Sequence, residues 1–224
     1  QGSSPWSYGL ANIRRRAIPS LVQATALGLG MMALLTLTLT RNDLLEDWHA
    51  RLPENAPNRF LVNVQPDQQE KLMAFFDEHA IPRPKVFPMV RGRLTKINDR
   101  PIDLDDFPDP RAKQLINREF NLSWTDTLQP DNEIVAGQWW QEKPASLSPE
   151  LSMEDGFAET IGLKLGDRLA FYAGGRDFSA TITSLRKVDW DTFQVNFFAV
   201  VRPGVLDSYS ASYITSFYLP PDKQ

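Results

Sequence analysis

An uninterrupted run of 24 uncharged residues, 17–40, constrains this 224-residue chain more than any other feature. The run reads AIPSLVQATALGLGMMALLTLTLT, and Gln23 is its only strongly polar side chain. At about 1.5 Å per residue, a helix of this length covers roughly 36 Å and exceeds the ~30 Å hydrocarbon core of a bilayer. The sequence therefore predicts a transmembrane helix over residues 17–40.

A cleaved secretory signal and a buried core helix are the alternatives for this run. The apolar core of a signal peptide has about 7–15 residues and precedes a small-residue cleavage site. Here the run is longer, and Arg41, Asn42 and Asp43 follow it. A twin-arginine signal meets the same objection of length. The length of the run favours a retained membrane helix.

The charges on either side of the run predict its orientation. Arg14, Arg15 and Arg16 precede it, and no acidic residue occurs among the first 40 positions. The rest of the chain carries 21 basic and 28 acidic residues, a net charge of −7. The positive-inside rule then places residues 1–16, as a cytoplasmic or interfacial segment, inside the cell and residues 41–224 outside the cytoplasm.

Small residues recur within the run at a spacing of four. Ala24 and Gly28 form one such pair, and Ala26 and Gly30 form another. Pairs of this kind let a neighbouring membrane helix approach closely. The same glycines match G-x-G-x-x-A, but a dinucleotide site needs a preceding strand and a βαβ unit, which an apolar span cannot provide. The pattern therefore indicates helix packing within a larger membrane bundle.

Residues 41–57 are predicted to form a stalk. Apolar residues recur there at helical spacing, so we expect the membrane helix to continue as an amphipathic segment until Pro53. An arginine at its start marks the expected exit from the bilayer, because a charge is best placed at the interface. The stalk residues are Arg41, Leu44, Leu45, Trp48 and Leu52.

The rest of the chain predicts an α+β body. Residues 58–98 read as a strand, a helix and two strands broken at Gly92, which is a β-α-β-β unit. Residues 192–201 and 211–219 read as strands whose character suits the same sheet. We therefore expect a split α/β subdomain, 58–98 plus 189–220, whose two ends lie together at the membrane face.

Residues 110–188 read as a β-rich unit inserted into the first subdomain. Gly162 ends a predicted helix, and Gly174-Gly175 reads as a hairpin turn. Four large aromatic side chains of this unit are candidates for an apolar surface that meets cargo or a partner. In a small β unit such residues more often serve as core. The four are Trp124, Trp139, Trp140 and Phe157.

No motif points to a catalytic, cofactor or metal site. The absence of cysteine excludes a cysteine nucleophile, thiolate-bound zinc and an iron–sulfur cluster. His49 and His79 are the only histidines, and no zinc motif, G-x-S-x-G elbow or phosphate-binding loop occurs. The acidic balance of residues 41–224 also argues against a nucleic-acid partner.

One acidic loop has carboxylates that could bind calcium. Its carboxylates crowd a proline-rich stretch, but the glycine and the terminal glutamate of an EF-hand loop are missing. A solvated acidic loop is the better interpretation. The residues are Asp103, Asp105, Asp106 and Asp109.

Several segments resemble one family of membrane proteins. WSYGLANIRRR followed by an apolar span resembles the start of a half-permease in the FtsX-like/MacB-like class of ABC transporter permeases. More specifically, PMVRGRLTKIN, VAGQWW and MEDGFAETIGLKLGDRLAFYAGG look like the large permeases encoded beside a lysophospholipase/thioesterase-type hydrolase. The likeness runs from about residue 6 to residue 221.

This resemblance implies a transporter component without its own active site or cofactor. Its domain outside the bacterial inner membrane would lie between membrane helices and comprise a porter-like α/β part and an inserted β-rich part. A separate cytoplasmic ATPase would drive it, and residues 41–224 would be periplasmic. The implied cargo is hydrophobic or lipid-like and is handed to the partner hydrolase. With one span, the chain looks like a fragment of such a permease.

Two other functions remain open from the sequence. The chain could be a single-pass, membrane-anchored binding or scaffold module that recruits a periplasmic enzyme. It could also be an anchored hydrolase, although each histidine lacks a signature partner for that chemistry. The small-residue face of the span and the expected proximity of the two ends of the body favour the permease.

Overall fold

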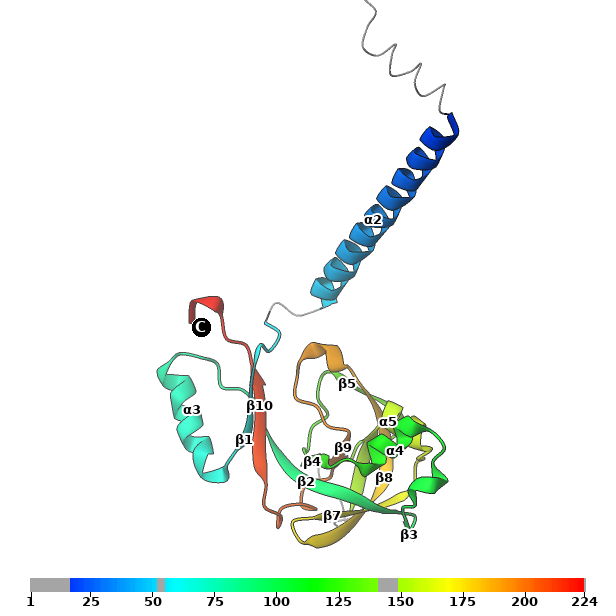
Figure 1. Cartoon of the computed structure of the whole chain (residues 1–224). Helices are drawn as coiled ribbons and strands as arrows, with labels where there is room; N and C mark the ends of the chain where they lie inside the picture. Colours follow the sequence, from blue (N-terminus) through cyan, green and yellow to red (C-terminus); the bar gives the residue numbers. More distant parts are fainter. Residues whose placement is uncertain (1–16, 52–54, 141–148, 224) are drawn as a thin grey trace, which may run out of the picture. The chain divides into compact units, whose positions relative to one another are not determined.

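The computed structural model describes residues 17–51, 55–140 and 149–223 (Figure 1). It divides into two compact units, residues 1–53 and residues 54–224, and each is described here by itself. Among the described residues, the first unit is one helix and the second is a mixed α/β body. The predicted combination of an apolar N-terminal helix with an α/β body is confirmed.

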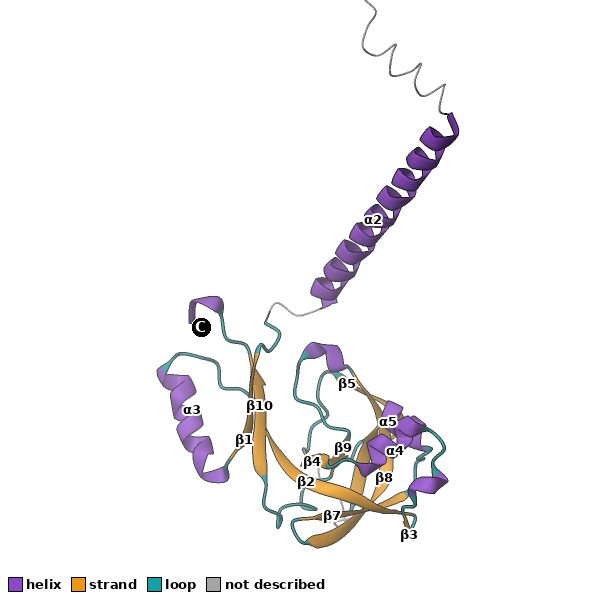
Figure 2. Cartoon of the chain, in the orientation of Figure 1, coloured by secondary structure: helices purple, strands orange, loops and turns teal. Residues whose placement is uncertain are grey.

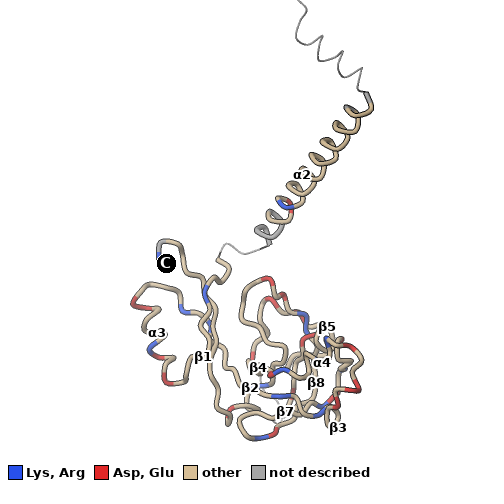
Figure 3. The backbone as a smooth tube through the Cα atoms, viewed as in Figure 1, with Lys and Arg blue, Asp and Glu red and all other residues tan. Residues whose placement is uncertain are grey.

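The first unit is helix α2 (Ala17–Arg51), which is 35 residues long. Its part Leu21–Leu45 is long and apolar enough to cross a membrane, with a mean hydropathy of 1.7. Figure 3 shows that charged residues on α2 are confined to its C-terminal part. The hydroxyls of Thr25, Thr36 and Thr38 donate to the carbonyl four residues earlier, at 2.8, 2.9 and 2.8 Å, so the backbone satisfies them within the apolar stretch.

The body is built on ten hydrogen-bonded strands with short helices on their outside (Figure 2). The strands are β1 (Arg59–Val64), β2 (Val86–Ile97), β3 (Arg100–Pro101), β4 (Phe120–Trp124), β5 (Asn132–Gly137), β6 (Glu150–Glu154), β7 (Arg168–Ala173), β8 (Arg176–Val188), β9 (Ala199–Val201) and β10 (Ser212–Phe217). The helices are η1 (Pro66–Gln68), α3 (Gln69–Glu78), η2 (Leu104–Asp106), α4 (Pro110–Asn117), α5 (Asp155–Ile161), η3 (Trp190–Thr192) and η4 (Pro221–Lys223).

Six of the strands close into a small barrel. β2 pairs with β4, β4 with β9, β9 with β6, β6 with β8, β8 with β7, and β7 again with β2. The interior holds the main core, in which Phe120 meets Phe157 and Phe171 edge to face at 5.2 and 5.6 Å between ring centroids. Because the ring is closed, each of these six strands has a hydrogen-bonded neighbour on both sides.

Outside the barrel, β5 pairs with β8, the short β3 pairs with β2, and an arm is formed by β1, β10 and the first half of β2. β10 lies between β1 and β2 and is antiparallel to both. The predicted return of the C-terminal strand to the first sheet is therefore confirmed. Helix α3 packs on the arm through Phe76, which is buried and meets Phe217 edge to face at 4.9 Å.

Two strand predictions are wrong. β2 continues through Gly92, which pairs with both Phe120 and Ala173. A Cβ at Gly92 would lie 2.8 Å from the Leu122 side chain, so the glycine permits close strand approach instead of ending a strand. Of residues 192–201, only β9 is a strand. It pairs with β4 and β6 instead of the arm, because it fills the position between these two strands and so closes the barrel.

The expected division into two subdomains stays a proposal. β2 belongs to both the arm and the barrel, and residues from 54 onward form one compact unit. The arm nevertheless draws on the two chain segments, 58–98 and 189–220, that the sequence assigned to the first subdomain.

Candidate functional site

The point where the chain enters and leaves the body is held by one asparagine. The Asn58 amide donates to the Leu219 carbonyl at 2.9 Å, and the Leu219 N–H donates to the Asn58 side-chain oxygen at 2.8 Å. The Asn58 N–H also donates to the Phe217 carbonyl at 3.1 Å. The segments before β1 and after β10 are therefore fastened to each other, and the two strands of the arm have a common base.

The segment after β10 is tied down a second time. Lys223 donates to the carbonyls of His79 and Ala80, at 3.0 and 2.8 Å, where α3 ends. A cation at this position satisfies carbonyls that the helix leaves without an intrahelical donor. The base of the arm therefore includes β1, β10 and the end of α3.

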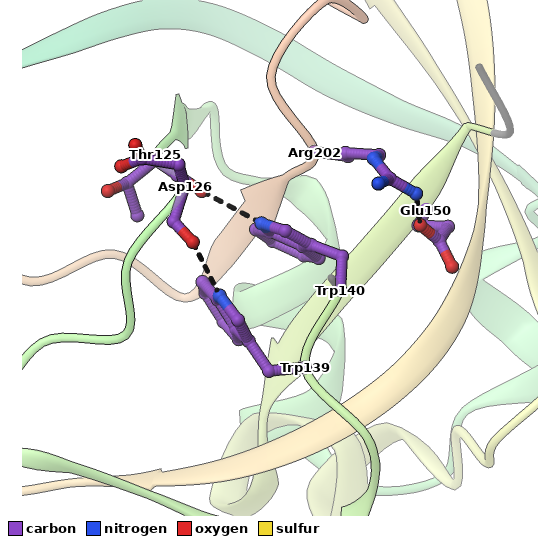
Figure 4. A network of polar contacts seen from close by, with 6 residues as sticks. All are labelled: Thr125, Asp126, Trp139, Trp140, Glu150 and Arg202. Carbon is purple, nitrogen blue, oxygen red and sulfur yellow. Dashed lines mark hydrogen bonds and ion pairs between the residues drawn. The ribbon is translucent and has the colours of Figure 1, made fainter. Parts of the chain in front are cut away.

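The tandem indoles Trp139 and Trp140 follow β5 and form one plug (Figure 4). Their ring centroids lie 3.9 Å apart, and their N–H groups donate to the carbonyls of Asp126 and Thr125, each at 3.0 Å. Trp140 is buried in a second core with Phe87, and Trp139 lies half-buried at the edge of that core. The plug therefore joins the loop after β4 to the arm.

Of the four aromatics predicted as candidates for a cargo or partner surface, two are buried and two are partly exposed, so such a surface stays a prediction for Trp124 and Trp139 alone. Phe157 is buried in the main core, where it meets Phe120, and Trp124 packs partly buried against the same core. Trp139 and Trp140 belong to the second core. Phe157 and Trp140 cannot present a surface, because both side chains are buried, and the Trp140 indole N–H is satisfied by the Thr125 carbonyl.

Beside the plug, Arg202 and Glu150 form an ion pair (Figure 4). The Arg202 side chain is 8% exposed and the Glu150 side chain 22%, so water screens this pair less than a surface pair. Arg202 follows β9 and Glu150 opens β6, so the pair stabilises the C-terminal end of β9, where the chain leaves the barrel.

Arg186 on β8 is the largest fully buried side chain among the described residues, and no motif in the sequence marks it. It is 1% exposed, and its guanidinium donates to the Asn132 side-chain oxygen at 2.9 Å, to the Ser152 carbonyl at 2.8 Å and to the Phe197 carbonyl. Burial lowers the pKa of Arg186 to about 10, while the charge of Glu154 acts to raise it. The side chain remains a cation at neutral pH.

The network around Arg186 extends into the segment before β9. The Asn196 amide oxygen accepts from Asn132 at 2.8 Å, and its nitrogen donates to Asp131 at 2.7 Å. Thr192 donates to the same Asp131 carboxylate at 2.9 Å. Residues 192–198 contribute Val195 and Phe197 to the second core, so this network fixes the connection between the barrel and the arm.

A local signal for Arg186 was present in the sequence. Alternate residues of β8 point inward, from Ala180 through Ile182 and Ser184 to Arg186 and Val188. An arginine in phase with inward-facing residues indicates a buried cation that needs several acceptors.

The acidic loop is used for helix capping. Asp103 accepts from the Asp105 N–H at 3.0 Å and Asp109 from the Arg111 N–H at 2.9 Å, so these carboxylates cap η2 and α4. Within the described ranges, no group of three or more acidic or histidine side chains is arranged to hold a metal.

We expect the stability of the chain not to depend on a metal ion. Thermal melts of the full chain in detergent with calcium, zinc or EDTA should have the same midpoint. A calcium-dependent rise of more than about 5 °C would contradict this expectation, because it corresponds to roughly 1 kcal/mol or more for a domain of this size.

The one histidine side chain in the described part of the structure gives no support to a hydrolase. His79 stacks on Phe75 with ring centroids 4.1 Å apart, and its Nδ1 lies 2.9 Å from the Phe75 carbonyl oxygen. His49 lies on α2, and its side chain is outside the described part of the structure.

The predicted membrane residues lie on α2. Ala24, Ala26, Gly28 and Gly30 are exposed within the chain, and a Cβ at either glycine would meet nothing within 4 Å. Arg41, Leu44 and Leu45 also lie on this helix and are exposed. The Trp48 side chain, Leu52 and Arg14, Arg15 and Arg16 lie outside the described residues, so the packing, stalk and orientation roles stay predictions.

Comparison with known proteins gives one extensive match. No protein-family model matches the chain. The chain is 38% identical over 215 residues to YbbP, an uncharacterised ABC transporter permease of Escherichia coli (strain K12), and the match covers 96% of this chain. It covers 25% of the relative, so this chain spans a quarter of that permease's length.

A solved structure gives a weaker match. It is a domain of a protein described as a permease from Porphyromonas gingivalis, 13% identical, covering 67% of each chain with a TM-score of 0.34.

Proposed function

We propose that this chain supplies a membrane helix and the extracytoplasmic domain of an ABC transporter permease subunit. The observation that carries the proposal is the 38% identity with a permease over 96% of the chain. The subunit would couple ATP hydrolysis by a separate cytoplasmic ATPase to mechanical work outside the bacterial inner membrane, and it would have no enzyme activity of its own.

The fastening of the body supports this proposal. A domain inserted between two membrane helices needs its first and last residues at one place, and Asn58 joins the two segments there. Helix α2 provides an apolar stretch of sufficient length at one of these ends. The relative is about four times as long as this chain, which leaves room for further helices.

The cargo and the second partner come from the family resemblance. We propose a hydrophobic or lipid-like substrate that is passed to a periplasmic lysophospholipase/thioesterase-type hydrolase. In this scheme the porter-like subdomain, 58–98 plus 189–220, takes up movement from the membrane helices. The inserted subdomain, 110–188, then meets the cargo or the hydrolase.

Cysteine labelling tests the topology directly. The chain has no native cysteine, so Ser3→Cys and Leu104→Cys each introduce the only thiol. In cells with a permeabilised outer membrane, an impermeant maleimide should label position 104, and position 3 only after the inner membrane is opened. The full-length protein should also copurify with an ATPase. External labelling at position 3, or release of the body after processing, would contradict the proposal.

A further inference from the structure

Two large aromatic side chains are exposed on the turn between β8 and β9. Trp190 in η3 is 45% exposed and Phe193 directly after it is 40% exposed. One side of the Trp190 ring packs on Phe198, with centroids 4.9 Å apart, so the ring is held in place while much of it faces outward. Exposed aromatic groups of this kind mark interaction surfaces.

The turn that carries them is fixed by its surroundings. Phe193 has φ +56°, a left-handed conformation that is unfavourable for a bulky residue. The Asp189 carboxylate accepts from the Asp191 N–H at 3.1 Å, and Thr192 is bound to Asp131 at 2.9 Å. The fold therefore holds both aromatics at the surface even though the left-handed backbone of Phe193 is unfavourable.

The turn lies at the end of the body that the chain enters and leaves. In Figure 1, η3 (orange) is at the same end as the start of β1 and the end of β10, and η2 lies at the opposite end beside β3. Six residues, 52–57, separate the last residue of α2 from Asn58, and an extended chain of six residues spans at most about 22 Å. This end of the body is thus the one at which the chain arrives from the apolar helix.

The charges around Trp190 specify which surface the turn can meet. A hollow of about 600 Å³ beside it is lined by the acidic residues Asp131, Glu133, Asp189 and Asp191, with Lys187 as the one basic residue of the lining. Carboxylates and an indole face attract ammonium groups, as in the headgroups of zwitterionic phospholipids. The same carboxylates repel a surface rich in anionic lipid.

We propose that this turn is an interfacial anchor that docks on a zwitterionic phospholipid surface. Trp190 and Phe193 enter the headgroup region, where aromatic side chains are favoured, and the acidic rim receives the headgroup ammonium groups. The inference rests on the proposed membrane span of α2. Anchoring would fix the orientation of the body against the bilayer next to the base of the arm.

A spin label at Gln194→Cys tests the anchor in the full chain reconstituted into phosphatidylcholine vesicles. Gln194 is exposed beside Phe193, and Leu104→Cys on η2 is the matched label at the opposite end. We expect the label at 194 to be protected from a water-soluble nickel complex and the label at 104 to stay accessible. Protection should weaken as phosphatidylglycerol replaces phosphatidylcholine.

Substitution of the aromatics should release the turn. Trp190→Ser with Phe193→Ser should lower the ratio of docked to undocked body by about tenfold or more, because two apolar groups lose their burial. Tyr172→Ser is the control, since Tyr172 is 50% exposed on β7 and lies outside the turn. It should leave protection at 194 unchanged.

The outcomes separate this inference from the proposed span. After alkaline washing, protein that still floats with the vesicles is membrane-embedded. If the labels at 194 and 104 are equally accessible to the nickel complex in this protein, the anchor is overturned and the span is left intact. Failure to float with the vesicles overturns the span. Contact with a second copy of the chain would give a different result. Protection at 194 would then vary with the protein-to-lipid ratio, and spin–spin broadening would disappear on dilution with unlabelled chain. This result would also overturn the anchor.

Discussion

Arg186→Met should lower the free energy of unfolding by about 3–5 kcal/mol, the range for removing one member of a buried charged network. Methionine is similar in length but donates no hydrogen bond. The carbonyls of Ser152 and Phe197 and the side-chain oxygen of Asn132 would lose their donor, and each unsatisfied buried group costs about 1–3 kcal/mol. Glu154 would lose the neighbouring positive charge that the structure gives it.

Lys187→Met is the matched control for this variant. Lys187 is the next residue of β8 and is exposed, so its substitution should change the free energy of unfolding by no more than about 0.5 kcal/mol. Denaturant unfolding of the full chain in detergent measures both variants. Equal stability of the two variants would show that the buried network contributes nothing.

Arg186→Lys should be intermediate between the wild type and Arg186→Met. Lysine keeps the charge but cannot reproduce the planar fork that reaches acceptors on β5, β6 and the segment before β9. Residues 192–198 should exchange amide hydrogens faster in this variant, because Asn132 and the Phe197 carbonyl both lose their fixed partner. The change should spread to the turn that carries Trp190.

Features with a local cause could be predicted from the sequence. Gly162 ends α5 at φ +81°, and Gly174-Gly175 turn the β7–β8 hairpin at φ +54° and +83°, because glycine adopts these angles without steric cost. β7 and β8, the two strands that this turn joins, are each a continuous run of strand-forming residues bounded by a turn.

Features that depend on distant partners could not be predicted in this way. β6 reads ELSME, with an acidic residue at each end, yet it is buried between β9 and β8. Its acidic ends are explained only by the fold: Glu150 pairs with Arg202, and Glu154 caps α5 by accepting from Phe157 at 2.6 Å. Closure of the barrel by β9 is likewise a property of six strands together.

The candidate site likewise has features that could be predicted from the sequence and features that could not. The common location of the two ends of the body could be anticipated, since the first and last strands had matching character. The burial of Trp140 could not, because it depends on a carbonyl of Thr125 that lies fifteen residues earlier and in another segment. The sequence therefore indicated which residues were unusual but not which of them face solvent.

In the transporter that we propose, inserting two glycines after Asn42 should abolish the extracytoplasmic work while ATP hydrolysis continues. α2 is helical from Ala17 to Arg51, roughly 52 Å at 1.5 Å per residue, so it extends well beyond a ~30 Å hydrocarbon core. A continuous helix transmits rotation and tilt because its backbone is hydrogen-bonded throughout. Two interior glycines disfavour the helix by about 2 kcal/mol and turn the following face by roughly 200° if it persists.

The body itself should tolerate this insertion, because α2 and the body are separate compact units and no core contact of the body is removed. Two controls separate transmission from folding. A two-glycine insertion after Gly174, at the tip of the β7–β8 hairpin, tests tolerance to insertion as such. Four alanines after Asn42 add slightly more than one turn and nearly restore the original face, so they should retain part of the work. If the glycine insertion in α2 leaves transport intact, the helix transmits no movement, and the body acts instead as a tethered scaffold.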